Sequence, residues 1–249
     1  MRARFDATGE VLVVTGGANG IGAGLARAYG AAGGTAVVLD VVAPPADSPA
    51  AGAPGVEHRI VDVADRDAVV AMIEAIVADH GRIDGLVAGA AVQPRSDVAT
   101  MDPEEWRRTL AVNLDGVVWA CQAVLPTMTA QRRGSIVVFA SGLANFGRAQ
   151  ASAYAASKAA LVAYAKSLAA EVVAQRVRVN VVYPGVIDTP QFQAANPTGG
   201  EREHWARTTG IGTPDDVVGP LLFLLSDDAT MTGSVLTRDR AFPGEEAGA

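Results

Sequence analysis

The feature that most constrains the fold is a regular alternation of short apolar runs with longer amphipathic segments. Most of the apolar runs are continuous and rich in Val, Ile and Leu, which is typical of strands buried on both faces of a parallel sheet. We predict strands at 11–15, 36–39, 57–61, 85–88, 135–139, 178–182 and 234–236. We predict helices at 21–32, 66–79, 103–129, 153–175 and 214–225. This alternation predicts one α/β domain over residues 1–249, a doubly wound parallel sheet of about seven strands flanked by helices.

Two stretches between these elements are rich in Pro and Gly. We expect 43–55 to be a surface loop. We expect 189–212 to be a late insertion that closes over a ligand, with a short helix at 201–207. The 103–129 segment is expected to break near Asn113. Pro220 is expected to kink the last helix or to delay its start.

The charge and composition limit the partners and the compartment. The chain has 27 acidic and 20 basic residues and a net charge of −7, which disfavours binding to nucleic acid or to an anionic membrane. No apolar run approaches the roughly 20 residues of a membrane span, and the first residues hold no apolar signal core. Cys121 is the single cysteine and is expected to be buried, and the three histidines form no metal-ligand pattern. We therefore expect a cytoplasmic protein without a metal site.

A glycine-rich turn follows the first predicted strand, with the sequence TGGANGIG at 15–22. Glycines allow backbone N–H groups to approach a pyrophosphate, and the helix that follows directs its unpaired donors at the same anion. This arrangement predicts a Rossmann-type nucleotide site formed by Gly16, Asn19, Gly20, Ile21 and Gly22.

Acidic residues at the ends of the next two strands indicate how the adenosine is bound. Asp40 can accept hydrogen bonds from both ribose hydroxyls and would repel a 2′-phosphate, so we predict NAD as the cofactor. Asp62, with Val63 beside it, can receive the adenine amino group. The alternatives are a solvated strand-end carboxylate for Asp40 and a helix cap for Asp62.

Four polar residues form a candidate reacting set. Tyr154 and Lys158 lie four residues apart, so a helix places them on one face. A neighbouring ammonium stabilises the tyrosinate and lowers the pKa of the tyrosine, which makes it a plausible base for an alcohol proton. Ser141 ends the fifth strand and can hold the substrate oxygen, because the carboxyl ends of parallel strands face the ligand crevice. Asn113 can order a water that connects Lys158 to solvent.

With these residues in place, the chain closely resembles the short-chain dehydrogenase/reductase family. The resemblance covers TGGANGIG, the Ser-x12-Tyr-x3-Lys spacing with Asn113, and Tyr-Pro-Gly-Val-Ile-Asp-Thr at 183–189. It implies hydride transfer between a nicotinamide cofactor and an alcohol/ketone pair. It also implies that Ile187 and Thr189 meet the nicotinamide carboxamide, and that Lys158 holds the nicotinamide ribose.

The chain departs from the family pattern in two places. The family's Asn-Asn-Ala-Gly after the fourth strand is Ala-Gly-Ala-Ala at 88–91, so the hydrogen bond of the first Asn is unmade at Ala88 or supplied by water. Ala88 and Gly89 are still expected beside the cofactor. The family's Asp-Gly-Gly after the last strand is Asp-Arg-Ala at 239–241, which leaves the path of the C-terminal tail open.

The substrate stays open at this stage. We expect the substrate site to be lined by Gln93, Ser141, Leu143, Gln150, Tyr183, Phe192 and Trp205. This mixture fits a small or medium secondary alcohol, including a sugar or polyol, or a 3-oxoacyl substrate. A non-catalytic NAD-binding sensor is the alternative from another class. An extended epimerase or dehydratase is less compatible, because only 34 residues follow Asp215.

The two helices around the reacting set also suggest self-association. They carry apolar residues on more than one face, namely Val117, Trp119, Val124, Leu161, Tyr164 and Leu168. Exposed apolar faces of this size favour association, and the family resemblance implies pairing through these helices. We expect a homotetramer or a homodimer; the alternative is that one sheet-facing stripe accounts for all six residues.

Overall fold

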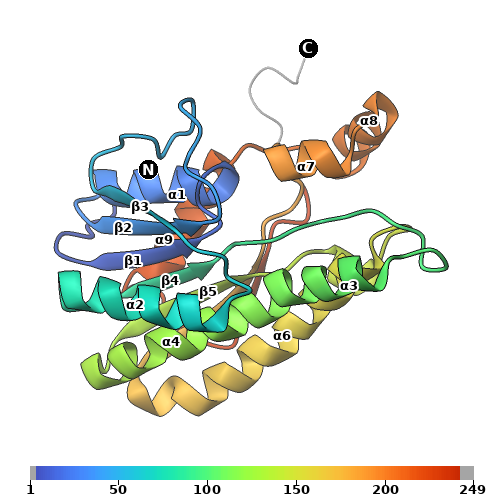
Figure 1. Cartoon of the computed structure of the whole chain (residues 1–249). Helices are drawn as coiled ribbons and strands as arrows, with labels where there is room; N and C mark the ends of the chain where they lie inside the picture. The colour runs from blue at the N-terminus through green and yellow to red at the C-terminus, as the bar shows by residue number, and fades with distance from the viewer. Residues whose placement is uncertain (1–3, 242–249) are drawn as a thin grey trace.

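The computed structural model, which describes residues 4–241, contains one parallel sheet of seven strands in the order β3-β2-β1-β4-β5-β6-β7 (Figure 1). The strands are β1 Val11–Thr15, β2 Thr35–Asp40, β3 Val56–Ile60, β4 Gly85–Ala88, β5 Gly134–Phe139, β6 Val177–Tyr183 and β7 Val235–Thr237. The order reverses between β1 and β4, and a crevice at the carboxyl ends of strands beside such a reversal is the usual ligand site.

Helices cover both faces of the sheet. They are α1 Gly20–Ala31, α2 Arg66–His80, α3 Pro103–Leu110, α4 Gly116–Gln131, α5 Leu143–Phe146, α6 Ser152–Val172, α7 Pro190–Ala195, α8 Gly199–Thr208 and α9 Asp215–Leu225. Helices α1 and α9 pack on one face, and α2, α4 and α6 pack on the other (Figure 1). Successive side chains of β1 point to opposite faces of the sheet. Val13 packs with α2, α4 and α6. Leu12 and Val14 pack with α1 and α9. The predicted doubly wound sheet is confirmed.

The expected break near Asn113 is wrong. Helices α3 and α4 are joined by a π-helical turn, Ala111–Asp115, into one continuous helix. The turn persists because Asn113 is fully buried and its side chain bonds to the backbone of Val92 and to Ser157. The last helix, α9, begins at Asp215, one residue after the predicted start, and runs through Pro220.

This continuous helix bears on the expectation that the chain has no membrane span. Pro103–Gln131 has 29 residues and is long and apolar enough to cross a membrane by length and composition alone. Of its most apolar window, 44% is buried inside the structure. A helix that packs on a sheet passes the same test, because its core face is apolar.

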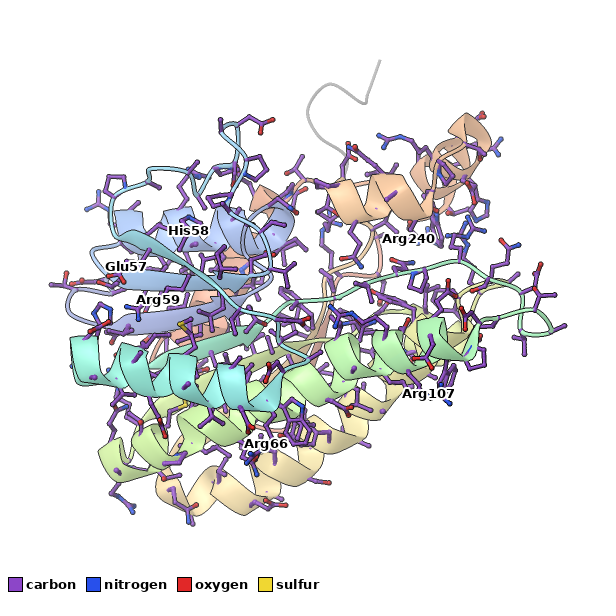
Figure 2. The ribbon with its side chains drawn as sticks, viewed as in Figure 1. Glu57, His58, Arg59, Arg66, Arg107 and Arg240 are labelled. Carbon is purple, nitrogen blue, oxygen red and sulfur yellow. The ribbon has the colours of Figure 1, made fainter. Side chains whose placement is uncertain are left out.

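The edge strand β3 is protected by charged and polar side chains. Glu57, His58 and Arg59 follow one another along it (Figure 2). The Arg59 guanidinium donates to Asp79 at 2.7 Å and to Glu57 at 3.2 Å. Charged residues of this kind discourage an edge strand from pairing with another chain.

Most of the apolar residues that suggested subunit contacts lie inside this chain's own core. Val117, Val124, Leu161 and Leu168 are all at most 5% exposed. Trp119 and Tyr164 are only partly buried against the core. The sheet-facing stripe therefore accounts for four of the six residues. Only Trp119 and Tyr164 of this set have exposed surface that could contact another copy.

Candidate active site

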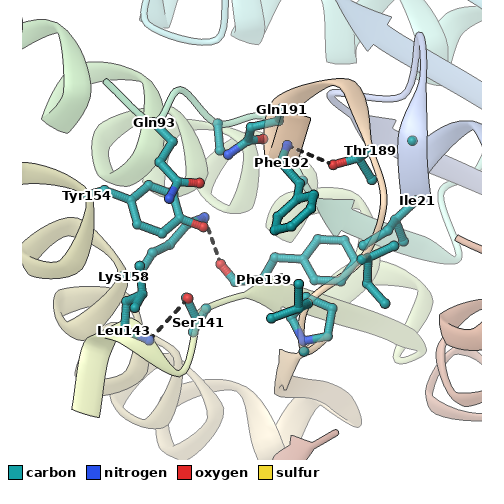
Figure 3. Close-up of a pocket in the computed structure, with 18 of the residues that line it drawn as sticks. Ile21, Gln93, Phe139, Ser141, Leu143, Tyr154, Lys158, Thr189, Gln191 and Phe192 are labelled. Carbon is teal, nitrogen blue, oxygen red and sulfur yellow. Dashed lines mark hydrogen bonds between the residues drawn. The ribbon is translucent and has the colours of Figure 1, made fainter. Parts of the chain in front are cut away.

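A cavity lies at the carboxyl ends of the central strands, and residues of α7 and α8 contribute to its lining (Figure 3). The glycine-rich turn, the segments after β4 and β5, and the first half of α6 form its walls. Tyr154, Lys158 and Ser141 lie on one side of the cavity, and Ile21 and Thr189 lie on the other (Figure 3). The insertion predicted at 189–212 therefore does form one wall, with two helices instead of the single short one expected.

The glycine-rich turn packs tightly against neighbouring backbone of the same chain. Gly16 has a φ of +71°, and a Cβ added there would come within 2.5 Å of the Ala90 Cα. A Cβ at Gly22 would meet the Gly16 carbonyl oxygen at 2.7 Å. Asn19 precedes α1 without capping it by its side chain, and the first turn of α1 has no acidic residue. The turn therefore presents free backbone donors to an anion.

Asp40 is held at the end of β2 beside this turn. Its Oδ2 accepts a hydrogen bond of 3.0 Å from the Ala18 N–H. The 43–55 loop is tied to the same turn, because the Ser48 hydroxyl donates to the Ala18 carbonyl at 2.7 Å. The carboxylate therefore has a fixed position next to the phosphate cradle, although it lies outside the cavity itself.

Asp62 and Val63 also lie outside the cavity, after β3. The Asp62 carboxylate pairs with Arg108 at 2.9 Å and accepts from the Ala64 N–H at 3.0 Å. These contacts lower the pKa of Asp62, against the effect of its partial burial. Asp65, not Asp62, caps α2, since it accepts from the Ala68 N–H. The cap alternative therefore does not apply to Asp62, and Val63 is a buried core residue.

Tyr154 and Lys158 lie one turn apart on α6, as predicted. Lys158 is 2% exposed, and its Nζ donates a hydrogen bond of 2.9 Å to the carbonyl of Phe139. The same Nζ lies 5.7 Å from the centre of the Tyr154 ring. Burial lowers the pKa of Lys158 to about 8.

The pKa of Tyr154 differs from the sequence expectation. Burial raises it to about 12, and a hydrogen bond with Ser141 opposes that rise only in part. In the protein without cofactor the phenol is therefore neutral at pH 7. Ser141 Oγ also accepts from the Leu143 N–H at 3.2 Å, which fixes the hydroxyl after β5.

Asn113 lies in the π-helical turn, fully buried, and is not among the residues that line the cavity. Its Oδ1 accepts from the Val92 N–H at 2.8 Å, and its Nδ2 donates to the Val92 carbonyl at 2.9 Å and to Ser157 Oγ at 3.2 Å. The side chain is thus occupied in joining the π-helical turn to α6 and to the segment after β4.

Five of the seven residues expected at the substrate site line the cavity, namely Gln93, Ser141, Leu143, Phe192 and Trp205. Gln150 and Tyr183 do not. Gln150 Oε1 instead accepts from Arg95 Nη2 at 3.0 Å, and the Tyr183 hydroxyl lies 3.4 Å from Asn145 Oδ1. Sequence reasoning missed further lining residues in the short helices and loops around the site, including Phe146, Arg148, Gln191, Asn196, Thr209 and Asp239.

The turn after β4, where Ala88 stands in place of the family's first Asn, is bonded to the neighbouring strand. Ala88 is 1% exposed at the end of β4. Thr15 Oγ1 accepts from the N–H groups of Gly89, at 3.1 Å, and Ala90, at 3.3 Å. A side-chain oxygen of β1 therefore braces this turn without a side chain at 88.

Comparison with known proteins agrees with this geometry. Residues 10–199 match the family model described as short chain dehydrogenase. The chain is 35% identical to the 3-oxoacyl-[acyl-carrier-protein] reductase FabG of Thermotoga maritima, over 93% of this chain and 96% of the relative. It is 38% identical to the D-threitol dehydrogenase of Mycolicibacterium smegmatis, over 91% and 90%. A solved structure of a candidate NAD(P)-dependent gluconate 5-dehydrogenase from Beutenbergia cavernae, with NADP bound at low occupancy, superposes with a TM-score of 0.88 at 32% identity, covering 95% and 98%.

The chain therefore belongs to the short-chain dehydrogenase/reductase family. It is an oxidoreductase that acts on CH–OH groups and the corresponding ketones with a nicotinamide dinucleotide, NAD(P), and a small-molecule substrate.

Proposed function

We propose that this protein is an NAD-dependent dehydrogenase/reductase of small or medium secondary alcohols, with Tyr154 as the acid/base. The observation that carries the proposal is the convergence of Tyr154, Ser141 and Lys158 on one cavity that also contains the glycine cradle. When bound, the nicotinamide cofactor supplies or accepts the hydride.

The glycine-rich turn suits the cofactor's pyrophosphate. The cavity lining includes Gly16, Asn19, Gly20, Ile21 and Gly22, and the last three of these form the first turn of α1, whose N–H groups have no intrahelical partner. Ile187, Thr189 and Gly89 also line the cavity, which supports their assignment beside the nicotinamide. Asp40, Asp62, Val63 and Ala88 would lie along the adenosine side, outside the enclosed part.

In this mechanism the chain's own groups handle the proton and the substrate oxygen. Ser141 donates a hydrogen bond to the substrate oxygen and holds it beside the Tyr154 hydroxyl. In the reducing direction neutral Tyr154 gives its proton to that oxygen, for which a pKa of about 12 in the free protein is suitable. In the oxidising direction the tyrosinate must form. The positive charges of Lys158 and of the oxidised nicotinamide would favour it by lowering the pKa of Tyr154.

Lys158 and Asn113 would return the proton to solvent. Lys158 is also proposed to hold the nicotinamide ribose. The Asn113 side chain is committed to Val92 and Ser157, so we assign the ordering of a water to its main-chain carbonyl. Interruptions of the regular helical ladder by a π-turn often occur at functional sites.

NAD is proposed over NADP because of Asp40. Its carboxylate is fixed by the Ala18 N–H and is followed by the apolar Val41 and Val42. Named relatives include both a 3-oxoacyl reductase and a polyol dehydrogenase. Because the charge of Asp40 disfavours the 2′-phosphate of NADP, it supports a dehydrogenase activity over a 3-oxoacyl reductase activity.

We further propose that the protein is cytoplasmic, binds neither membrane nor nucleic acid, and functions as a homotetramer or homodimer. The net charge of −7 supports the first two points. The partly exposed Trp119 and Tyr164 support the third.

A substrate panel tests the proposed activity. Polyols, cyclic and acyclic secondary alcohols and their ketones are each assayed with NAD(H) and NADP(H) by nicotinamide absorbance. We expect turnover of at least one secondary alcohol or ketone with NAD(H). Binding of NADH without turnover of any member of the panel would instead favour a non-catalytic sensor.

A further inference from the structure

Two arginines and one glutamate form a charged cluster at the wall of the cavity. We call Arg95, Arg148 and Glu201 the outer cluster. Both guanidinium groups contact the same atom, Glu201 Oε1, with Arg148 Nη2 at 2.9 Å. The three side chains are 24%, 20% and 22% exposed, respectively.

The outer cluster has more positive than negative charge. Two guanidinium groups share one carboxylate, and the second oxygen of that carboxylate accepts from the Thr198 hydroxyl at 2.9 Å. The pKa of Arg148 is lowered, first by burial and then by the nearby charge of Arg95. Groups of this kind that are withdrawn from water gain most from a further anionic partner.

Arg148 is the member of the cluster that faces the ligand space. It lines the cavity, whereas Arg95 and Glu201 do not. Its Nη1 donates to Asn196 Oδ1 at 2.8 Å, and its guanidinium lies 5.4 Å from the ring centre of Trp205. Asn196 and Trp205 both line the cavity as well.

The loop that carries Arg148 is held in an uncommon conformation. Gly147 and Gln150 flank it with φ values of +65° and +64°. A residue with a side chain rarely adopts this left-handed region, so other contacts must maintain it at Gln150. They come from Arg95 Nη2, which donates to Gln150 Oε1 at 3.0 Å, and from the Ser96 N–H, which donates to the Gln150 carbonyl at 3.1 Å.

The rest of the cavity wall determines what else the ligand must be. Its other charged lining residues are Lys158, at the reacting end, and Asp239, after β7. Phe146, Phe192 and Trp205 supply aromatic surface to the wall, and Trp205 lies against Arg148. The wall therefore offers aromatic surface to the body of a ligand and the guanidinium of Arg148 to an anionic group on it.

We propose that Arg148 binds a carboxylate on the substrate, so that the substrate class is a secondary alcohol or ketone with an apolar body and a single carboxylate. The inference rests on the proposed function. The single excess positive charge of the outer cluster matches a monoanion better than a dianionic phosphate. A planar guanidinium also matches the two oxygens of a carboxylate.

Binding of an unreactive pair of ligands tests this proposal without requiring turnover. The enzyme saturated with NADH is titrated by calorimetry with cyclohexanecarboxylate and with cyclohexanecarboxamide, which differ in charge and little in shape. We expect the acid to bind about tenfold to a hundredfold more tightly, as for one charge-assisted hydrogen-bonded pair.

Three variants assign the preference to Arg148. Arg148→Gln should reduce the acid-to-amide ratio of affinities to near one, and Arg148→Lys should retain part of it because the charge remains. Arg207→Gln removes the same charge from the exposed side of α8, where Arg207 is 71% exposed, and should leave the ratio unchanged. A role of Arg148 confined to holding α8 through Glu201 would weaken both ligands equally.

The outcomes separate this inference from the proposed function. Equal affinities for acid and amide in the wild type, no measurable binding of the acid, or a preference that survives Arg148→Gln would each overturn the carboxylate site. Reduction of 4-oxocyclohexanecarboxylate and of its carboxamide is then measured with NADH. An acid preference in binding, with no turnover of any alcohol or ketone, would overturn the proposed function and leave the carboxylate site standing.

Discussion

Lys158 Nζ donates a 2.9 Å hydrogen bond to the carbonyl oxygen of Phe139, the last residue of β5. The bond connects α6 to the strand that leads into Ser141. It holds a buried ammonium at the reacting end of the cavity, where burial lowers the pKa of Lys158 from 10.5 to about 8. A charge kept there in the free protein costs folding free energy, and that cost gives a test that needs no substrate.

Replacement of Lys158 should change how stability depends on pH. Below pH 8 the lysine is protonated in both the folded and the unfolded state, and the folded state bears the cost of burial. Between pH 8 and 10.5 the unfolded state binds more protons, so wild-type stability rises with pH. The shift corresponds to about 3 kcal/mol. Cofactor-free Lys158→Met should therefore be the more stable protein at pH 7, and its advantage should shrink toward pH 10.

Urea unfolding of the cofactor-free proteins at several pH values measures this difference. Lys166→Met is the matched control, because Lys166 is exposed on the same helix and should leave the pH dependence unchanged. Titrations of groups that do not interact with Lys158 are shared by all three proteins and cancel in the comparison. A wild-type minus Lys158→Met difference that stayed constant from pH 7 to pH 10 would contradict burial of the charge.

Removal of the Tyr154 hydroxyl should separate binding from chemistry. Tyr154→Phe keeps the ring and the cavity wall but has no proton to transfer, so NADH should still bind while turnover nearly vanishes. Fluorescence titration measures the first and a steady-state assay the second. Tyr164→Phe makes the same change on the same helix outside the cavity and should keep its activity. A Tyr154→Phe enzyme with most of the wild-type rate would remove Tyr154 from the mechanism.

Loss of the Ser141 hydroxyl should affect kcat more than NADH binding. One hydrogen bond to the developing charge on the substrate oxygen would be missing, so Ser141→Ala should lower kcat at least about tenfold. Ser226→Ala removes a hydroxyl at the end of α9, away from the cavity, and serves as the control. Similar rates for the two variants would show that Ser141 does not act on the reacting oxygen.

The sheet and its helices could be predicted because the spacing of apolar residues within each element reflects which of its side chains are buried, and this spacing can be read from the local sequence. The strand runs at 11–15 and 85–88 were predicted with the bounds that the structure has. The π-helical turn was not predictable from the local sequence. It occurs together with contacts of Asn113 to Val92 and Ser157, which lie 21 and 44 residues away along the chain. A pattern within one segment cannot reveal such contacts. The amphipathic patterns on either side of Asn113 are offset from each other, and this offset suggested two separate helices.

Loop side chains at the site were the least predictable. Gln150 was assigned to the substrate wall, but its left-handed backbone and its bond to Arg95 place it outside the cavity. Arg148, two residues earlier, lines the cavity and was missed, because an irregular loop has no period from which a direction can be inferred. Tyr183 ends β6 beside the site, yet its hydroxyl lies against Asn145 and outside the cavity.

Assembly gives a prediction that a mass measurement decides. If Trp119 and Tyr164 contact another copy, light scattering at micromolar protein should return at least twice the 25.5 kDa of one chain. Because Val117, Val124, Leu161 and Leu168 are already buried within one chain, the interface would depend on these two partly exposed side chains. A stable mass of one chain across the concentration range would rule out both the dimer and the tetramer.

The choice between NAD and NADP depends on Asp40. A 2′-phosphate would lie close to its carboxylate, and two like charges about 4 Å apart repel by roughly 4 kcal/mol at an effective dielectric near 20. The hydrogen bond from the Ala18 N–H, at 3.0 Å, limits how far Asp40 can move to relieve that repulsion. NADP would also lose the hydrogen bond that the free 2′-hydroxyl donates. We expect wild-type kcat/KM to favour NAD by a hundredfold or more, since each 1.4 kcal/mol is about a factor of ten.

Exchange of this charge should move the preference in steps. Asp40→Asn should raise kcat/KM for NADP, and the addition of Val41→Arg should raise it further by pairing with the phosphate. Asp67→Asn is the control, because it removes one negative charge from a side chain that is 95% exposed on α2, away from the cavity. The measurement is kcat/KM for both cofactors with one competent substrate. Equal use of NADP and NAD by the wild type would show that Asp40 does not select the cofactor, even with Tyr154 and Ser141 in their proposed roles.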